Sequence, residues 1–123
     1  MKCIYAISSD VSETGCRLAG QYTEALSKLS DDAISLGDSL RAFAELHAVA
    51  VVKVDDEDWA RVIVTFGTQA ERELAGELFL SSNDAMSIKS ALAGSRRLVG
   101  GLNLSAWFGN HAGHGCSFVM VSE

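Results

Sequence analysis

The spacing of apolar residues along the chain changes between that of a strand and that of a helix. Residues 2–8 are nearly all apolar or small, which predicts a buried central β-strand. From Ser12 to Leu29 apolar residues recur at every third or fourth position, so we expect one face of an amphipathic helix. A second helix is predicted from Asp38, as its N-cap, to about His47.

The middle of the chain has the pattern of a β-hairpin followed by a helix. Residues 49–54 are apolar and mostly β-branched, and residues 59–66 place apolar side chains at alternate positions. Between these predicted strands lies the short polar turn Asp55–Asp58. Thr68, with a glutamate three residues later, forms a capping box that opens a predicted helix ending near Leu78.

The last third of the chain predicts a helix, a strand, a loop and a final strand. We expect the helix over 84–93, the strand over 102–108, the glycine-rich loop over 109–115 and the last strand over 116–121. The element order is then β-αα-β-β-αα-β-β. It predicts an α+β fold whose antiparallel sheet has about five strands, with helices on one face.

The predicted element order is similar in two successive parts of the chain. A shift of 56 residues places 2–57 on 58–113 and aligns a Leu-Ala-Gly tripeptide from each part. We interpret the chain as a single domain, residues 1–123, with an internal repeat and a terminal strand over 116–121. Two β-α-β units in tandem would give a ferredoxin-like split βαβ topology.

The composition is typical of one globular domain. Hydrophobic residues make up 48% of the 123 positions, charged residues 21%, and no apolar run reaches the roughly 18 residues of a membrane span. The N-terminal apolar run is too short for a signal peptide, so we expect a cytoplasmic protein. The three scattered cysteines, Cys3, Cys16 and Cys116, argue against a disulfide framework.

The negative charge is concentrated in the first two thirds of the chain. Residues 1–84 carry 15 acidic against seven basic side chains, a net charge of −8, whereas residues 85–123 carry one against three, a net of +2. Such a body repels phosphates, which argues against nucleic-acid binding and favours a protein partner with a basic surface. We expect that partner at four adjacent carboxylates on the predicted turn: Asp55, Asp56, Glu57 and Asp58.

Two tryptophans are candidates for the same interface. Trp59 adjoins the acidic turn, and Trp107 holds the matching place in the second predicted unit. Large aromatic residues dominate interfaces when exposed and fill cores when buried. The alternation of 102–108 puts Trp107 on the sheet face away from the helices, which a partner or a second copy in a homodimer would cover.

A short histidine- and cysteine-containing segment is the candidate metal site. His111, His114 and Cys116 offer ligands that suit zinc, nickel or copper, with a fourth ligand such as Cys3. The same residues also fit a thiol nucleophile, Cys116, beside the His114 imidazole. The third interpretation is a flexible loop before a strand, and the spacing matches no established zinc signature.

These patterns favour a small acidic, non-catalytic protein-interaction module of the inhibitor, immunity or regulatory type that needs no cofactor. Its partner is expected to present a basic protein surface, with no nucleic acid or membrane involved. The alternative is a small-molecule-binding domain or a cofactor-free enzyme on a dimeric α+β sheet. Its site would lie between helices and sheet, with Tyr22, His47, Trp107 or the loop His111–Cys116 as polar contributors.

Overall fold

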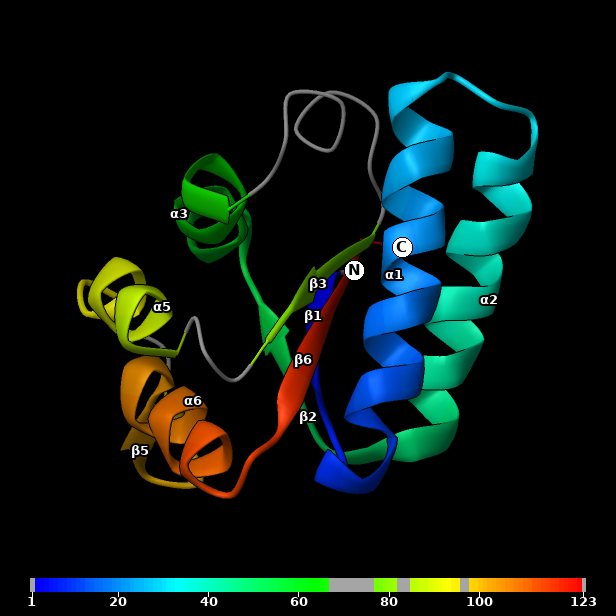
Figure 1. The fold of residues 1–123 in the computed structure, drawn as a ribbon. Coiled ribbons are helices and arrows are strands. Elements are labelled where there is room, and N and C mark those ends of the chain that lie inside the picture. Colours follow the sequence, from blue (N-terminus) through cyan, green and yellow to red (C-terminus); the bar gives the residue numbers. More distant parts are fainter. Residues whose placement is uncertain (1, 67–76, 82–84, 96–97, 123) are drawn as a thin grey trace.

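The fold is an antiparallel sheet with a layer of helices on each side (Figure 1). The computed structural model describes residues 2–66, 77–81, 85–95 and 98–122. In chain order, the elements are β1 (Lys2–Ile7), the short 3-10 helix η1 (Ser9–Val11), α1 (Ser12–Ser27), α2 (Asp32–His47), β2 (Ala48–Val54), α3 (Asp56–Phe66), β3 (Glu77–Leu80), α5 (Ala85–Leu92), β4 (Leu98–Val99), β5 (Leu102–Asn103), α6 (Leu104–Gly113) and β6 (Ser117–Ser122).

The strands of the main sheet lie in the order β2-β1-β6-β3, and each neighbouring pair is antiparallel. This confirms the α+β class, the antiparallel sheet and the central position of the first strand. In the described part of the chain the sheet has four strands, because β4 and β5 form a separate hairpin. Gly100 and Gly101 make the turn of that hairpin with φ of 58° and 86°, which glycine adopts without strain.

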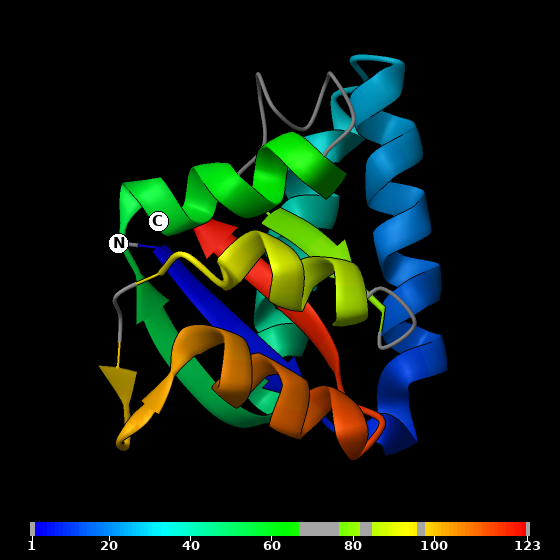
Figure 2. The ribbon, with the colours of Figure 1, turned by 90° about the vertical axis from the view of Figure 1, so that its left-hand side faces the viewer.

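Helices cover both faces of the sheet, so the prediction of helices on one face is wrong (Figures 1 and 2). On one face, α1 and α2 bury Tyr22 and Leu40 against Val119 of β6. On the other, α3, α5 and α6 pack over the sheet, and Phe108 meets Phe118. The error arises because two segments predicted as strands are helices, and these helices need a sheet face of their own to bury their apolar sides.

Residues 59–66, predicted as a strand, belong to α3. The helix begins where the Asp55 side chain accepts a hydrogen bond of 2.8 Å from the backbone N–H of Asp58. Three acidic residues in the first turn also complement the helix dipole. Trp59 and Val62, three positions apart, then face the core together. The N-terminal cap outweighs the alternating pattern that favoured a strand.

Residues 102–108, also predicted as a strand, enter α6 at Leu104. Asn103 is the N-cap, and its side chain accepts a hydrogen bond of 2.8 Å from a backbone N–H of the first turn. Leu104, Trp107 and Phe108 follow helical spacing and are all buried. In a strand, Trp107 would point to the opposite face from Leu104 and Phe108, and the three side chains could not all be buried together as they are in the helix.

The remaining expectations divide in the same way. The helices predicted over 12–29 and 84–93 are confirmed as α1 and α5, whereas α2 begins at Asp32, so Asp38 lies inside it. The predicted helix from Thr68 lies outside the described residues up to 76, and its expected end at Leu78 is wrong because Leu78 belongs to β3.

The strand order also corrects the predicted topology. In a split βαβ arrangement another strand separates the two strands that a helix connects. Here β1 and β2, which α1 and α2 connect, are direct neighbours, so the ferredoxin-like topology is wrong. The repeat of 2–57 and 58–113 stays a prediction, although the element order that suggested it has changed.

Candidate functional site

The acidic cluster predicted as the partner-binding turn is the N-terminus of α3. Lys2 Nζ lies 2.8 Å from Asp56, and its hydrogen bond and charge hold the pKa of the Asp56 carboxyl below its ordinary value. Arg61 lies 2.6 Å from Glu57 and 3.3 Å from Asp58. Lys2, Arg61 and the cap of α3 therefore neutralise much of the negative charge of this cluster. That the cluster contacts a partner stays a prediction.

The two tryptophans are buried rather than exposed. Trp59 is 9% and Trp107 6% accessible, and both belong to the core beneath α3, α5 and α6. Trp107 contacts the rings of His111 and Phe118, with centroids 4.8 and 6.2 Å away. The expected open sheet face that bears Trp107 is therefore wrong, and with it goes the argument for a homodimer that covers such a face.

The candidate metal residues lie at the end of α6 and just after it, where a loop was expected. His111 packs against Trp107, and His114 Nδ1 lies 2.8 Å from the Asn110 carbonyl oxygen. Burial, with a smaller effect from the His114 charge, lowers the pKa of His111. No group of three or more ligating side chains converges among the described residues, which include His111, His114 and Cys116. The geometry thus lends the metal site no support.

Cys116 does not have the surroundings of a nucleophile. The thiol is buried just before the last strand, and burial raises its pKa above the ordinary value. A reactive cysteine needs the opposite shift, because the thiolate is the attacking species. Cys3 is buried as well, whereas Cys16 is exposed on α1, and none of the three forms a disulfide.

We expect a thiol reagent such as dithionitrobenzoate to modify only Cys16 quickly in the folded protein. Cys3 and Cys116 should react only after denaturant unfolds the chain, because folding hides both thiols. Absorbance at the released thiolate band measures the number of fast thiols. Rapid modification of Cys116 in a Cys16→Ser variant would show that the last strand is more accessible than the structure has it.

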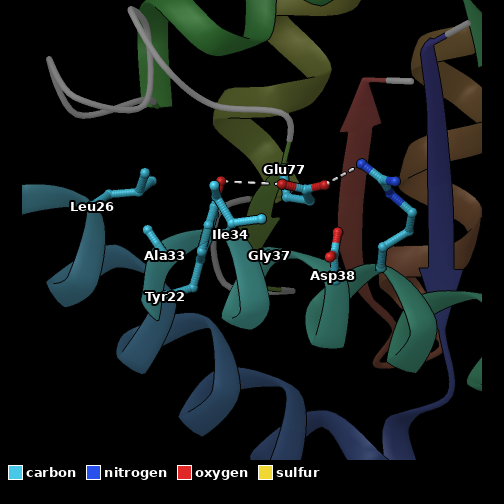
Figure 3. A pocket seen from close by; sticks show the side chains of 8 residues that line it. Tyr22, Leu26, Ala33, Ile34, Gly37, Asp38 and Glu77 are labelled. Atoms are coloured by element: carbon cyan, nitrogen blue, oxygen red, sulfur yellow. Dashed lines mark hydrogen bonds and ion pairs between the residues drawn. The ribbon is translucent and has the colours of Figure 1, made fainter. Parts of the chain in front are cut away.

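A pocket of about 230 Å³ opens on the α1–α2 side of the sheet (Figure 3). Its walls come from α1 (Tyr22 and Leu26), α2 (residues 33–41) and the first residue of β3, Glu77. Of the polar contributors expected for a small-molecule site, only Tyr22 lies here. The pocket brings together residues from three elements that are distant in the sequence, and sequence patterns did not single out this group.

A buried carboxylate stands at the base of this pocket. The Glu77 side chain is only 6% exposed, and Arg41 Nη2 donates a hydrogen bond of 2.7 Å to its Oε1. The Tyr22 hydroxyl donates to Oε2 at 3.1 Å. Gly37 allows this approach, since a Cβ there would lie 3.0 Å from both Glu77 Oε2 and Tyr22 Cε1. The carboxylate is thus fixed by two donors.

The exposed surface beside the pocket is acidic and apolar. Asp31, Asp32 and Asp38 are exposed, and Arg41, already bonded to Glu77, is the only Lys or Arg between 30 and 47. Large apolar side chains also face solvent: Leu29 is 76% and Ile34 78% exposed. We call these five exposed residues the tip surface: Leu29, Asp31, Asp32, Ile34 and Asp38. Ile34 and Asp38 line the pocket, whereas Asp32 lines a second hollow together with Lys28.

Leu29 holds its exposed position at a conformational cost. Its φ of 51° is left-handed, and it closes α1 in a Schellman motif, with hydrogen bonds from Leu29 N to Leu26 O at 3.1 Å and from Ser30 N to Ala25 O at 2.9 Å. Glycine is the usual residue at this position because other side chains are strained there. An exposed leucine in a strained turn is a feature that folding alone does not explain.

We expect Leu29→Gly to raise the free energy of unfolding by about 1 kcal/mol, because glycine relieves the left-handed strain. Ile34→Gly is the matched control. Ile34 is equally exposed but lies inside α2, so glycine should destabilise there by about 1 kcal/mol. Urea unfolding measures both changes. A loss of stability in Leu29→Gly would mean that Leu29 makes contacts that outweigh the strain.

The protein is thus an α+β fold with helices on both faces of its sheet. On the α1–α2 side, exposed acidic and apolar side chains lie near a pocket. Comparison with protein-family models, curated proteins and solved structures gives no match, so function must be argued from the geometry. In the part of the chain that the structure describes, none of the helices has both the length and the apolar character needed to cross a membrane.

Proposed function

We propose that this protein is a non-catalytic interaction module that binds a basic segment of another protein through the tip surface. The observation that carries the proposal is the placing of two exposed, large apolar side chains, Leu29 and Ile34, near three exposed aspartates, while the neighbouring cation, Lys28, is paired with Glu24. Apolar anchors supply binding energy, and charge of one sign steers a partner of the opposite sign. We place this activity in the cytoplasm, where cysteines that form no disulfide stay reduced.

The size of the pocket favours a protein partner over the alternative of a small-molecule ligand. Sites for such ligands usually enclose roughly 300–1,000 Å³ and bury most of the ligand. The pocket beside the tip surface measures about 230 Å³ and opens to solvent. This volume suits one side chain of a partner better than a complete ligand.

Affinity capture from a lysate of the source organism tests the proposal. The bait is the wild-type protein, compared with the double variant Ile34→Ser/Asp38→Asn. The control, Leu46→Ser/Glu45→Gln, removes one exposed apolar and one exposed acidic side chain from the far end of α2. We expect a basic protein that the wild type and the control retain, that the tip variant loses by tenfold or more, and that salt elutes.

Two results would overturn the proposal. One is equal capture by the wild type and the tip variant, which would place binding elsewhere. The other is the absence of any basic protein that distinguishes them. Because both variants change exposed side chains, circular dichroism should show the same folded state for all three baits.

A further inference from the structure

The pocket beside the tip surface combines apolar walls with a negative end. Leu26, Ala33 and Ile34 provide apolar surface, and two carboxylates, the exposed Asp38 and the buried Glu77, also line the pocket. Figure 3 shows the Asp38 side chain rising from α2 below the ion pair between Glu77 and Arg41, on the far side of Glu77 from the Tyr22 hydroxyl. Among the described residues that line the pocket, one positive charge, that of Arg41, stands against these two negative charges.

This charge balance selects the sign of the ligand. Asp38 is exposed and has no ion-pair partner among the described residues, whereas Glu77 is already paired with Arg41. A positively charged group at the opening would gain the attraction of Asp38 while it lies near the buried Glu77 carboxylate. An anionic group would meet two carboxylates, and the one cation beside them, Arg41, already forms an ion pair with Glu77.

The walls and the volume select the shape. A lysine or arginine side chain has an apolar stem and a charged head, and such side chains bury the stem against apolar surface while the head stays at a polar end. The pocket offers this sequence of surfaces within about 230 Å³. Gly37 of α2 lines the pocket between Ile34 and Asp38 in sequence, at a helix-interior position where glycine is unfavourable relative to alanine. A Cβ at this position would lie 3.0 Å from Glu77 Oε2 and Tyr22 Cε1, so a larger residue would push these two side chains aside.

We infer that this pocket is a subsite for one lysine or arginine side chain of the partner, with Asp38 as the group that pairs with its charge. The inference rests on the proposed function, since it names the anchor by which the basic segment is held. The apolar walls position the stem, and the Tyr22–Glu77–Arg41 network keeps the negative end of the pocket rigid.

A titration with single blocked amino acids tests the subsite without the partner. The probes are the N-acetyl methylamides of arginine, lysine, norleucine and glutamate, added to the ¹⁵N-labelled protein and followed by amide shifts. We expect arginine and lysine to shift the amides of residues 33–41 with dissociation constants of about 1–10 mM, which is about −3 to −4 kcal/mol. Norleucine should bind at least fivefold more weakly, and glutamate should not bind.

Two variants make the result specific. Asp38→Asn should weaken the cationic probes about fivefold and leave norleucine unchanged, whereas Gly37→Ala should weaken all of them by displacing the Tyr22 and Glu77 side chains that line the pocket. Equal binding of norleucine and lysine, or preferred binding of glutamate, would overturn the cation subsite. If the blocked amino acids do not bind but the protein still captures a basic protein from the lysate, only the subsite is rejected. Probe binding without such capture rejects the proposed function.

Discussion

Replacement of Phe118 by alanine should lower the free energy of unfolding by about 3–5 kcal/mol, the usual loss for a buried phenylalanine. Phe118 lies on the central strand β6 and is fully buried. Its ring stacks on that of Phe108 with centroids 3.8 Å apart, and Trp107 lies 6.2 Å away. Alanine would leave a cavity between the sheet and α6. Urea unfolding followed by tryptophan fluorescence measures the loss.

A loss of this size is a large part of the roughly 5–15 kcal/mol that stabilises a typical domain. Phe118→Leu, which keeps most of the volume, should cost less and extends the test if the alanine variant does not fold. Leu46→Ala, at an exposed position, is the control and should change the stability by less than about 0.5 kcal/mol. A loss below about 1 kcal/mol for Phe118→Ala would contradict the packing of α6 on the sheet.

Arg41→Met should cost about 2–3 kcal/mol, because it leaves the buried Glu77 carboxylate without its cation. The expected loss is smaller than the about 3–5 kcal/mol of a fully buried pair, since the Arg41 side chain is 34% exposed and solvent screens part of the interaction. Methionine retains most of the apolar stem, so the variant reports mainly on the charge. Urea unfolding again gives the change in free energy.

A double-mutant cycle separates the ion pair from other effects of the substitution. Glu77→Leu removes the carboxylate, and the double variant Arg41→Met/Glu77→Leu leaves neither charge buried. We expect the double variant to be more stable than Arg41→Met alone, because apolar replacement of both partners avoids an uncompensated charge. Strictly additive losses would show that the pair contributes no coupling and that the rigid negative end of the pocket is misassigned.

Elements with a strong single periodicity could be predicted from the sequence. The first strand, α1, α5 and the last strand follow from runs of apolar residues with clear spacing. The segments 59–66 and 102–108 could not, because their apolar residues satisfy a period of two and a helical period alike. The deciding signals were the caps, Asp55 and Asn103, whose side chains hold the first turns of α3 and α6.

The candidate site was less accessible to sequence reasoning. The acidic residues were visible, but only the fold shows which of them the chain neutralises. Lys2 and Asp56 form an ion pair although two strands and two long helices separate them in the sequence. No local sequence pattern predicts such a contact. Glu77 was expected within a helix, and its contacts with Tyr22 and Arg41 depend on how α1 and α2 pack over the sheet. The strained Leu29 became apparent only from its φ.

The most direct test of the tip surface is an amide-shift map with a short amphipathic lysine–leucine peptide. Both the tip surface and the N-terminus of α3 are acidic. The tip surface differs because it also carries two large exposed apolar side chains, Leu29 and Ile34. We predict the largest shifts over residues 29–41, small shifts over 55–61, and a weaker response as salt rises. Largest shifts over 55–58, or shifts spread evenly over all acidic positions, would contradict binding at the tip surface.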